Sequence, residues 1–141
     1  MVTQNKCTRY WPEVEQDKVY GHVHVATLKE TTNPHYILRE FLVHHDSEDS
    51  EGRHISQFHF KAWPDHGVPH DPGTVLGFLS DVTLKQSTLA SEGHSPGPIV
   101  VHCSAGIGRT GTFIVIDILI NLITYQGIIK LLYCCVLGME H

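Results

Sequence analysis

The sequence predicts an α/β fold of the α+β type, in which a mixed, twisted sheet is flanked by helices. Three observations support this prediction. Segments with the two-residue alternation of β-strands fill the first half of the chain. From about residue 71 onward, the apolar residues follow helical spacing. Near residue 100, a short apolar run leads through a glycine-rich turn into a second helical pattern, which is typical of a buried strand followed directly by a helix.

The composition excludes several classes of protein. The chain has 141 residues, 41% hydrophobic and 18% charged, which fits one globular domain and argues against disorder, collagen or a coiled coil. Ten basic and 15 acidic residues give a net charge of -5 with no basic run, so a nucleic acid is not an expected partner. The longest apolar stretch, residues 113–123, is shorter than the ~20 residues of a membrane span. With no signal-peptide pattern and only four cysteines, we expect a reducing, cytoplasmic location.

Three strands are predicted in the first half, at residues 19–28, 36–43 and 56–62. Asn33-Pro34 and Gly52 mark the connections between them. The acidic run at residues 46–51 is interpreted as a solvated loop, with an acidic partner site as the alternative. The third strand alternates two sets of side chains: Phe58, Phe60 and Ala62 on one face, and Gln57, His59 and Lys61 on the other.

The second half changes to helical spacing. Asp71 can cap a helix whose first residue is Pro72, so a helix is predicted over residues 72–89. Residues 91–98 form a predicted loop, and 99–101 a strand buried on both faces. Residues 112–125 are apolar nearly all round, as expected of a buried helix, and Gln126-Gly127 provides its end.

The turn between that last strand and helix is where we expect the chemistry. Small residues and glycines let successive backbone N–H groups converge at a helix N-terminus, which makes an anion site. A cysteine at its mouth would have a lowered pKa, and an arginine at its far end could bind two oxygens of an oxyanion. This predicts phosphoryl transfer to cysteine. The segment reads His102-Cys103-Ser104-Ala105-Gly106-Ile107-Gly108-Arg109-Thr110-Gly111.

The simpler interpretation of Cys103 is a buried, inert thiol, because cysteine is among the most buried residue types. That interpretation would require the spacing to Arg109, the glycines and the strand–turn–helix context to coincide by chance. We therefore favour a nucleophile.

The segment HCSAGIGRTG resembles the phosphate-binding loop of the protein-tyrosine phosphatases: His-Cys, five residues, Arg, then Ser or Thr. Residues 63–69, WPDHGVP, resemble the mobile acid loop of that family. Lys6-Cys7, Tyr10-Trp11-Pro12 and Asp71-Pro72-Gly73 resemble its SH2-domain-containing non-receptor, corkscrew-like group. The resemblance covers residues 5–127 and implies a phosphotyrosine phosphatase fold.

The resemblance also implies roles for individual residues. Cys103 would attack the phosphorus of phosphotyrosine on a substrate protein, and Arg109 would bind the phosphoryl oxygens. Asp65 would protonate the leaving phenolate and then accept a proton from water. His102 would order the loop, and the Thr110 hydroxyl would ease departure of the Cys103 thiolate.

Further residues would support these steps. The backbone N–H groups of residues 104–109 would complete the phosphate site, and Trp63 and Pro64 would act in the hinge of the acid loop. No cofactor and no metal are implied.

Three groups of residues have other interpretations. From physics alone, Asp65 is a turn residue between Pro64 and Gly67. Histidine pairs such as His22 and His24, or His44 and His45, could be metal ligands, but no carboxylate or cysteine stands at metal spacing, so solvated or strand-face histidines are favoured. The adjacent Cys134 and Cys135 could be a redox or palmitoylation pair, and we interpret them as buried.

The chain also departs from the family pattern. The family's tyrosine-recognition loop, its glutamine-bearing loop and the SH2 domains have no counterpart here, and residues 128–141 do not resemble the family. We therefore expect a partial catalytic domain at residues 1–127, a divergent tail at 128–141, and exposed apolar surface. The predicted function is a protein-tyrosine phosphatase acting in signal transduction. The alternatives are an impaired piece that binds phosphotyrosine or competes for partners of a full-length enzyme, and a dual-specificity phosphatase with a shallow pocket.

Overall fold

The computed structural model describes residues 8–47, 52–64 and 67–126. These residues belong to two compact units, which divide at Pro96 and Gly97. The first unit holds the sheet and one helix, and the second holds the glycine-rich turn and the other helix.

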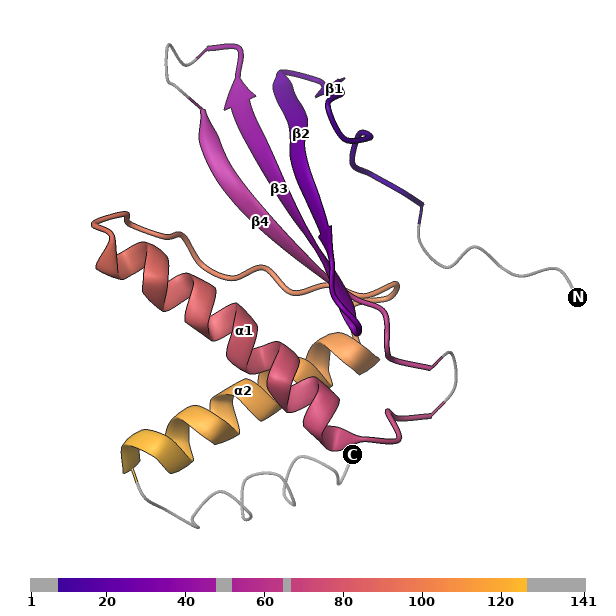
Figure 1. Cartoon of the computed structure of the whole chain (residues 1–141), viewed down its shortest axis with the longest axis vertical. Coiled ribbons are helices and arrows are strands. Elements are labelled where there is room, and N and C mark those ends of the chain that lie inside the picture. The colour runs from indigo at the N-terminus through magenta and orange to yellow at the C-terminus, as the bar shows by residue number, and fades with distance from the viewer. Residues whose placement is uncertain (1–7, 48–51, 65–66, 127–141) are drawn as a thin grey trace, which may run out of the picture. The chain divides into compact units, whose positions relative to one another are not determined.

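The first unit contains a four-stranded antiparallel sheet in the order β1-β2-β3-β4 (Figure 1). The strands are β1 (Asp17–Tyr20), β2 (Val23–Thr32), β3 (Tyr36–His45) and β4 (Arg53–Phe60). Each strand pairs with the next one along the chain, which is the pattern of short connections between antiparallel neighbours. The strands predicted at 36–43 and 56–62 correspond to β3 and β4.

The strand predicted over residues 19–28 is wrong as one element, because it divides into β1 and β2. Tyr20 pairs with Val23, so the two strands are joined by the two-residue loop Gly21-His22. Gly21 has φ of 63°, and a left-handed glycine in the first loop position is the arrangement of a type II′ hairpin turn. Alternation of apolar residues continues across such a turn, and so the sequence pattern conceals it.

Helix α1 (Pro72–Ser91) confirms the predicted helix and its start. Asp71 caps it by accepting a hydrogen bond from the Gly73 N–H at 2.9 Å, and proline occupies the first turn, where it sacrifices no hydrogen bond. The helix buries one face at i, i+3, i+4 and i+7 spacing. Its buried residues are Val75, Phe78, Leu79 and Val82.

Phe78 connects α1 to the sheet. Its ring lies 4.7 Å from that of Phe60 and 5.4 Å from that of Tyr36, centroid to centroid. Phe58 also contacts it, at 6.2 Å. The predicted face of β4 carrying Phe58 and Phe60 is thus confirmed as the face that packs on α1.

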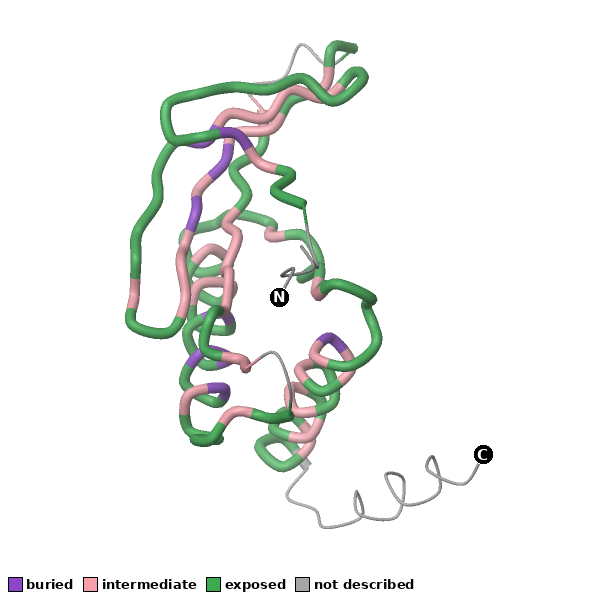
Figure 2. Tube along the Cα trace, turned by 90° about the vertical axis from the view of Figure 1, so that its right-hand side faces the viewer, coloured by how far each residue is buried: buried purple, intermediate pink, exposed green. Residues whose placement is uncertain are grey.

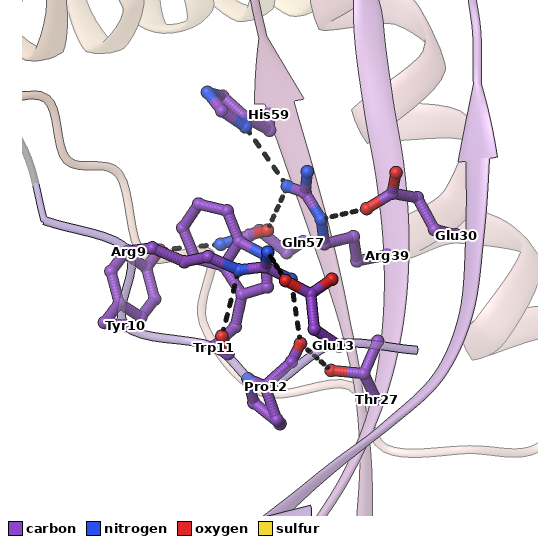
Figure 3. A network of polar contacts seen from close by, with 10 residues as sticks. All are labelled: Arg9, Tyr10, Trp11, Pro12, Glu13, Thr27, Glu30, Arg39, Gln57 and His59. Atoms are coloured by element: carbon purple, nitrogen blue, oxygen red, sulfur yellow. Dashed lines mark hydrogen bonds and ion pairs between the residues drawn. The ribbon is translucent and has the colours of Figure 1, made fainter. Parts of the chain in front are cut away.

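The opposite face of the sheet carries a buried charge. Arg39 is 5% exposed, and its Nε donates to Glu30 Oε2 at 2.6 Å (Figure 3). Its Nη1 donates to Gln57 Oε1 at 2.9 Å and lies 3.1 Å from His59 Nδ1. The guanidinium stands 4.4 Å from the centre of the Trp11 ring, so the buried charge is both paired and stacked.

The N-terminal segment is held on this face by hydrogen bonds. Thr27, the most buried residue of the sheet, donates from Oγ1 to the Pro12 carbonyl at 2.8 Å. Gln57 Nε2 donates to the Tyr10 hydroxyl at 2.7 Å, and the Tyr20 hydroxyl donates to the Tyr10 carbonyl. The Tyr10-Trp11-Pro12 motif therefore closes the sheet face opposite α1.

The second unit differs from the prediction in two ways. Residues 99–101 form no strand, and Val100 is 84% exposed. Helix α2 (Gly108–Gln126) begins four residues before the predicted helix and is not buried, as Figure 2 shows. Its exposed apolar side chains are Ile114, Val115, Ile118, Ile120, Ile123 and Tyr125. A helix that is apolar all round is buried only where other elements surround it, and the sequence of the helix alone does not show whether they do.

The α+β class is confirmed, with a sheet that differs from the predicted one. The parallel strand expected at 99–101 would have made the sheet mixed, whereas the four described strands are all antiparallel. The predicted exposure of apolar surface is also confirmed on α2. Among the described residues, neither helix combines the length and hydropathy that crossing a membrane requires.

We expect Phe78→Ala to lower the free energy of unfolding by about 3 kcal/mol, because it removes the ring that joins α1 to β3 and β4 and leaves a cavity. Leu84→Ala on the same helix is the control, since Leu84 is 64% exposed and such changes stay within about 0.5 kcal/mol. Urea unfolding followed by circular dichroism measures both. Equal losses in the two variants would contradict this account of the core.

Candidate active site

The loop before α2 turns back on itself at Gly106. Residues 104–107 are a run of bends, and α2 begins at the next residue. Gly106 has φ of 74°, a left-handed conformation that favours glycine. A Cβ added there would meet nothing within 4 Å, so backbone conformation and not crowding requires the glycine. The turn directs the Gly106 N–H to Cys103 Sγ, at 3.2 Å.

Cys103 lies in an environment that favours its thiolate. The pKa of its thiol falls from 9.0 to about 6. The Thr110 hydroxyl makes the largest contribution, followed by the Thr110 backbone N–H, and the N–H groups of Gly106 and Ala105 add to it, while partial burial opposes the shift. Donors that converge on a sulfur stabilise its negative charge. Cys103 is therefore largely ionised at neutral pH.

Thr110 is the one buried residue of the first turn of α2, with 8% of its surface exposed. Its Oγ1 meets no hydrogen-bond partner in good geometry among the described residues, yet the hydroxyl has the largest effect on the Cys103 pKa. The hydroxyl therefore acts on the sulfur through its proximity, without a hydrogen bond of standard geometry. Three backbone N–H groups, those of Thr110, Gly106 and Ala105, lower the pKa of Cys103 as well.

Arg109 and His102 flank this loop. Arg109 is the second residue of α2 and is half-buried, so it stands in the turn where helix N–H groups lack carbonyl partners and the helix dipole is positive. His102 is exposed, and its Nδ1 lies 3.2 Å from the Cys103 carbonyl oxygen. The cysteine and the arginine thus both belong to one loop–helix junction that suits an anion.

The acid-loop residues lie in the other unit. Trp63 and Pro64 are half-buried, and the Trp63 Nε1–H donates to the Gly67 carbonyl at 3.2 Å. Gly67 has φ of 81°, as a tight turn requires. Asp65 and His66 lie outside the described residues, and the role of Asp65 stays a prediction. The same is true of Cys134, Cys135, the tail at 128–141 and the division at Gly127.

Sequence reasoning missed one carboxylate among the histidines. Asp46 is hydrogen-bonded to His24 Nε2 at 2.5 Å and to His22 Nδ1 at 3.2 Å, and these bonds, His24's being the larger cause, hold its pKa below the usual 3.8. The β2–β3 pairing brings these residues together, because His24 lies opposite His44 and the Asp46 N–H donates to the His22 carbonyl at 2.9 Å. Within the described residues, no group of three or more His, Cys, Asp or Glu side chains could hold a metal.

Comparison with known proteins identifies the family. The sequence model described as "Protein-tyrosine phosphatase" matches residues 1–139. The chain is 55% identical over 125 residues to "Tyrosine-protein phosphatase corkscrew" of Drosophila virilis, covering 89% of this chain and 16% of that protein. It is 52% identical to the Drosophila melanogaster protein of the same name, over 89% of this chain and 15% of that protein. It is 38% identical to "Receptor-type tyrosine-protein phosphatase C" of Mus musculus, over 88% of this chain and 9% of that protein.

A loop that holds an ionised cysteine at a helix N-terminus places a nucleophile beside an anion site. Together with the family match over residues 1–139, it shows that the chain belongs to the protein-tyrosine phosphatase family. The chain spans about one sixth of the length of the corkscrew proteins that it resembles.

We expect alkylation of Cys103 by iodoacetamide to rise with pH around a midpoint near 6, because only the thiolate reacts. Mass spectrometry of the labelled peptides follows Cys103 separately from Cys7, Cys134 and Cys135. A free cysteine peptide, with a midpoint of about 8.5, is the reference. A midpoint for Cys103 that matches the peptide would refute the site described here.

Replacing Thr110 by valine keeps its shape and removes its hydroxyl. We expect the alkylation midpoint of Cys103 to rise by about one pH unit, since a hydrogen bond to a charged group is worth about 1.5 kcal/mol and 1.36 kcal/mol is one unit of pKa. Thr112→Val is the matched control, because the Thr112 hydroxyl donates to the Gly108 carbonyl at 3.0 Å. If both variants shift the midpoint equally, the effect comes from the helix and not from the hydroxyl beside the sulfur.

Proposed function

We propose that this protein hydrolyses phosphotyrosine on proteins through a phosphocysteine intermediate, in signal transduction. The observation that carries the proposal is the low pKa of Cys103 inside a loop of backbone N–H donors. Membership of the protein-tyrosine phosphatase family supports the same reaction. The proposed substrates are phosphotyrosine-containing proteins, and a cytoplasmic location stays a prediction of the sequence.

In the first step, Cys103 Sγ attacks the phosphorus of the substrate. The S–P bond forms as the bond between phosphorus and the tyrosine oxygen breaks, and Asp65 donates its proton to the leaving oxygen. Arg109 and the N–H groups of the loop from Ser104 to Gly108 bind the phosphoryl oxygens, where negative charge develops. Because these donors are fixed by the fold before substrate arrives, little reorganisation is needed.

In the second step, water attacks the phosphorus and the S–P bond breaks. Asp65, now a carboxylate, accepts the proton of the water, so one residue serves first as acid and then as base. The Cys103 thiolate leaves, and the same contacts that lower its pKa stabilise it as a leaving group. Thr110 makes the largest of these contributions, which supports its predicted role in this step. His102 is proposed to order the loop, and Trp63 and Pro64 to act as the hinge that brings Asp65 to the substrate.

The proposal is tested by following a phosphotyrosine peptide and a matched phosphoserine peptide with the whole chain. We expect steady turnover of the phosphotyrosine peptide only. Cys103→Ser should lower the rate about a thousandfold or more, because it removes the nucleophile. Asp65→Asn should lower it about a hundredfold, the scale of general acid catalysis.

Two outcomes would overturn the proposal in different ways. Binding of the phosphotyrosine peptide without any turnover, equal in the wild type and in Cys103→Ser, would favour the alternative of an impaired phosphotyrosine-binding piece. Equal hydrolysis of both peptides would favour a dual-specificity phosphatase.

A further inference from the structure

A concave site lies at the start of α1, within the first unit. It is a cavity of about 230 Å³ between the first turns of α1 and the start of β3. Sites for drug-sized ligands are larger, about 300–1,000 Å³, so this cavity suits a single side chain. None of the proposed catalytic residues lines it.

Two glycines open the cavity. Gly73 and Gly77 both line it, and they lie on one face of α1 because they are four residues apart. A glycine inside a helix costs about 1 kcal/mol relative to alanine. At Gly77 no close packing explains that cost, since an added Cβ would meet nothing within 4 Å. The absence of a side chain at Gly77 thus leaves open space beside the helix.

The charged side chains of the lining are two aspartates, and one of their carboxylate oxygens accepts no hydrogen bond from the described residues. Asp71 uses both carboxylate oxygens to cap the helix, accepting from the Gly73 N–H and the Thr74 hydroxyl at 2.9 and 3.2 Å. Asp81 accepts one hydrogen bond on Oδ2, from the Tyr36 hydroxyl at 2.9 Å. Among the described residues, no group donates to its Oδ1.

Within the described part of the chain, no lysine or arginine pairs with Asp81. Lys85 lies one turn further along α1, but its Nζ pairs with Glu40 Oε1 at 3.6 Å. Neither lysine nor arginine lines the cavity, and His35 is the one basic side chain there. Burial is the first cause that raises the pKa of Tyr36, and its hydrogen bond to Asp81 and the charge of Asp81 add to it. Asp81 is exposed, so its charge is available to a cation that enters the cavity.

Aromatic rings supply the remaining wall. Phe78 is 9% exposed, and its ring lies 5.4 Å from that of Tyr36. A guanidinium is planar, permanently charged and weakly hydrated, so it can stack on a ring while it donates to a carboxylate. An ammonium is more strongly hydrated and offers no flat face.

We propose that this cavity receives an arginine side chain from an exposed segment of a partner protein. The guanidinium donates to Asp81 Oδ1 and stacks against Phe78 or Tyr36, and its methylene stem crosses the space left by Gly77. The site is independent of the phosphatase reaction, because it uses none of the residues assigned to that reaction.

The test is a titration of the whole ¹⁵N-labelled chain with an acetylated, amidated Gly-Gly-Arg-Gly-Gly peptide at pH 7.5, followed by the amide shifts of Gly73, Thr74 and Gly77. We expect saturable binding with a dissociation constant of about 1 mM or weaker, as for a single side chain. The same peptide with citrulline, which is neutral and of the same shape, should bind at least tenfold more weakly. Equal binding of the citrulline peptide, or no shift of these amides, would overturn the proposal.

Two variants separate charge from space. Asp81→Asn retains an oxygen for the Tyr36 hydroxyl but loses the charge, and should weaken binding at least tenfold. Gly77→Leu fills the cavity with a better helix former and should abolish binding without loss of helical circular dichroism. Asp17→Asn, on the exposed strand β1, is the control and should bind as the wild type does. An equal loss in all three variants would show nonspecific attraction to an acidic protein and overturn the site. Because binding and not hydrolysis is read, failure here leaves the proposed phosphatase activity untouched.

Discussion

The negative charge on the Cys103 sulfur depends on two backbone segments that must keep fixed positions relative to each other. Ala105 and Gly106 belong to the loop, whereas Thr110 belongs to the first turn of α2, and all three direct N–H groups at Cys103. The loop can do this because Gly106 adopts a left-handed conformation, and the helix can because its first N–H groups have no carbonyl partners. Displacement of either segment would return the thiol toward its ordinary pKa. The loop–helix junction is therefore the unit on which any chemistry at Cys103 depends.

This junction was predictable from sequence because every part of it is local. Cys103, Gly106 and Arg109 lie within seven residues, and a glycine-rich turn before a helical pattern restricts the backbone to few conformations. The start of α1 was predictable for the same reason, since Asp71-Pro72 specifies both a cap and a first turn. Local signals of this kind can be read from the sequence because they do not depend on what packs against the segment.

The predictions failed where the outcome depends on distant neighbours or on a single conformation. Alternation of valines from 19 to 25 predicts one strand, and only the left-handed φ of Gly21 distinguishes a hairpin from a straight chain. Residues 99–101 have the composition of a buried strand, yet a strand exists only where a partner supplies hydrogen bonds. The helix over 112–125 was expected to be buried from its composition, and burial is a property of its neighbours. Asp46 could not be assigned to His22 and His24 before the register between β2 and β3 was known.

The two helix N-termini show how one physical device leads to opposite preferences for charge. Each helix begins with N–H groups that attract negative charge. At α1 the protein supplies that charge itself, because the Asp71 carboxylate accepts from Gly73 and Thr74. At α2 no acidic side chain occupies the first turn, and the N–H groups of the junction are directed to the Cys103 sulfur instead. The first terminus is capped by the chain's own carboxylate, and the cavity beside it also carries the carboxylate of Asp81, which would attract a cation. The second has a reactive thiolate at its entrance and Arg109 in its first turn, and so it is suited to a phosphoryl group, which brings the negative charge from outside.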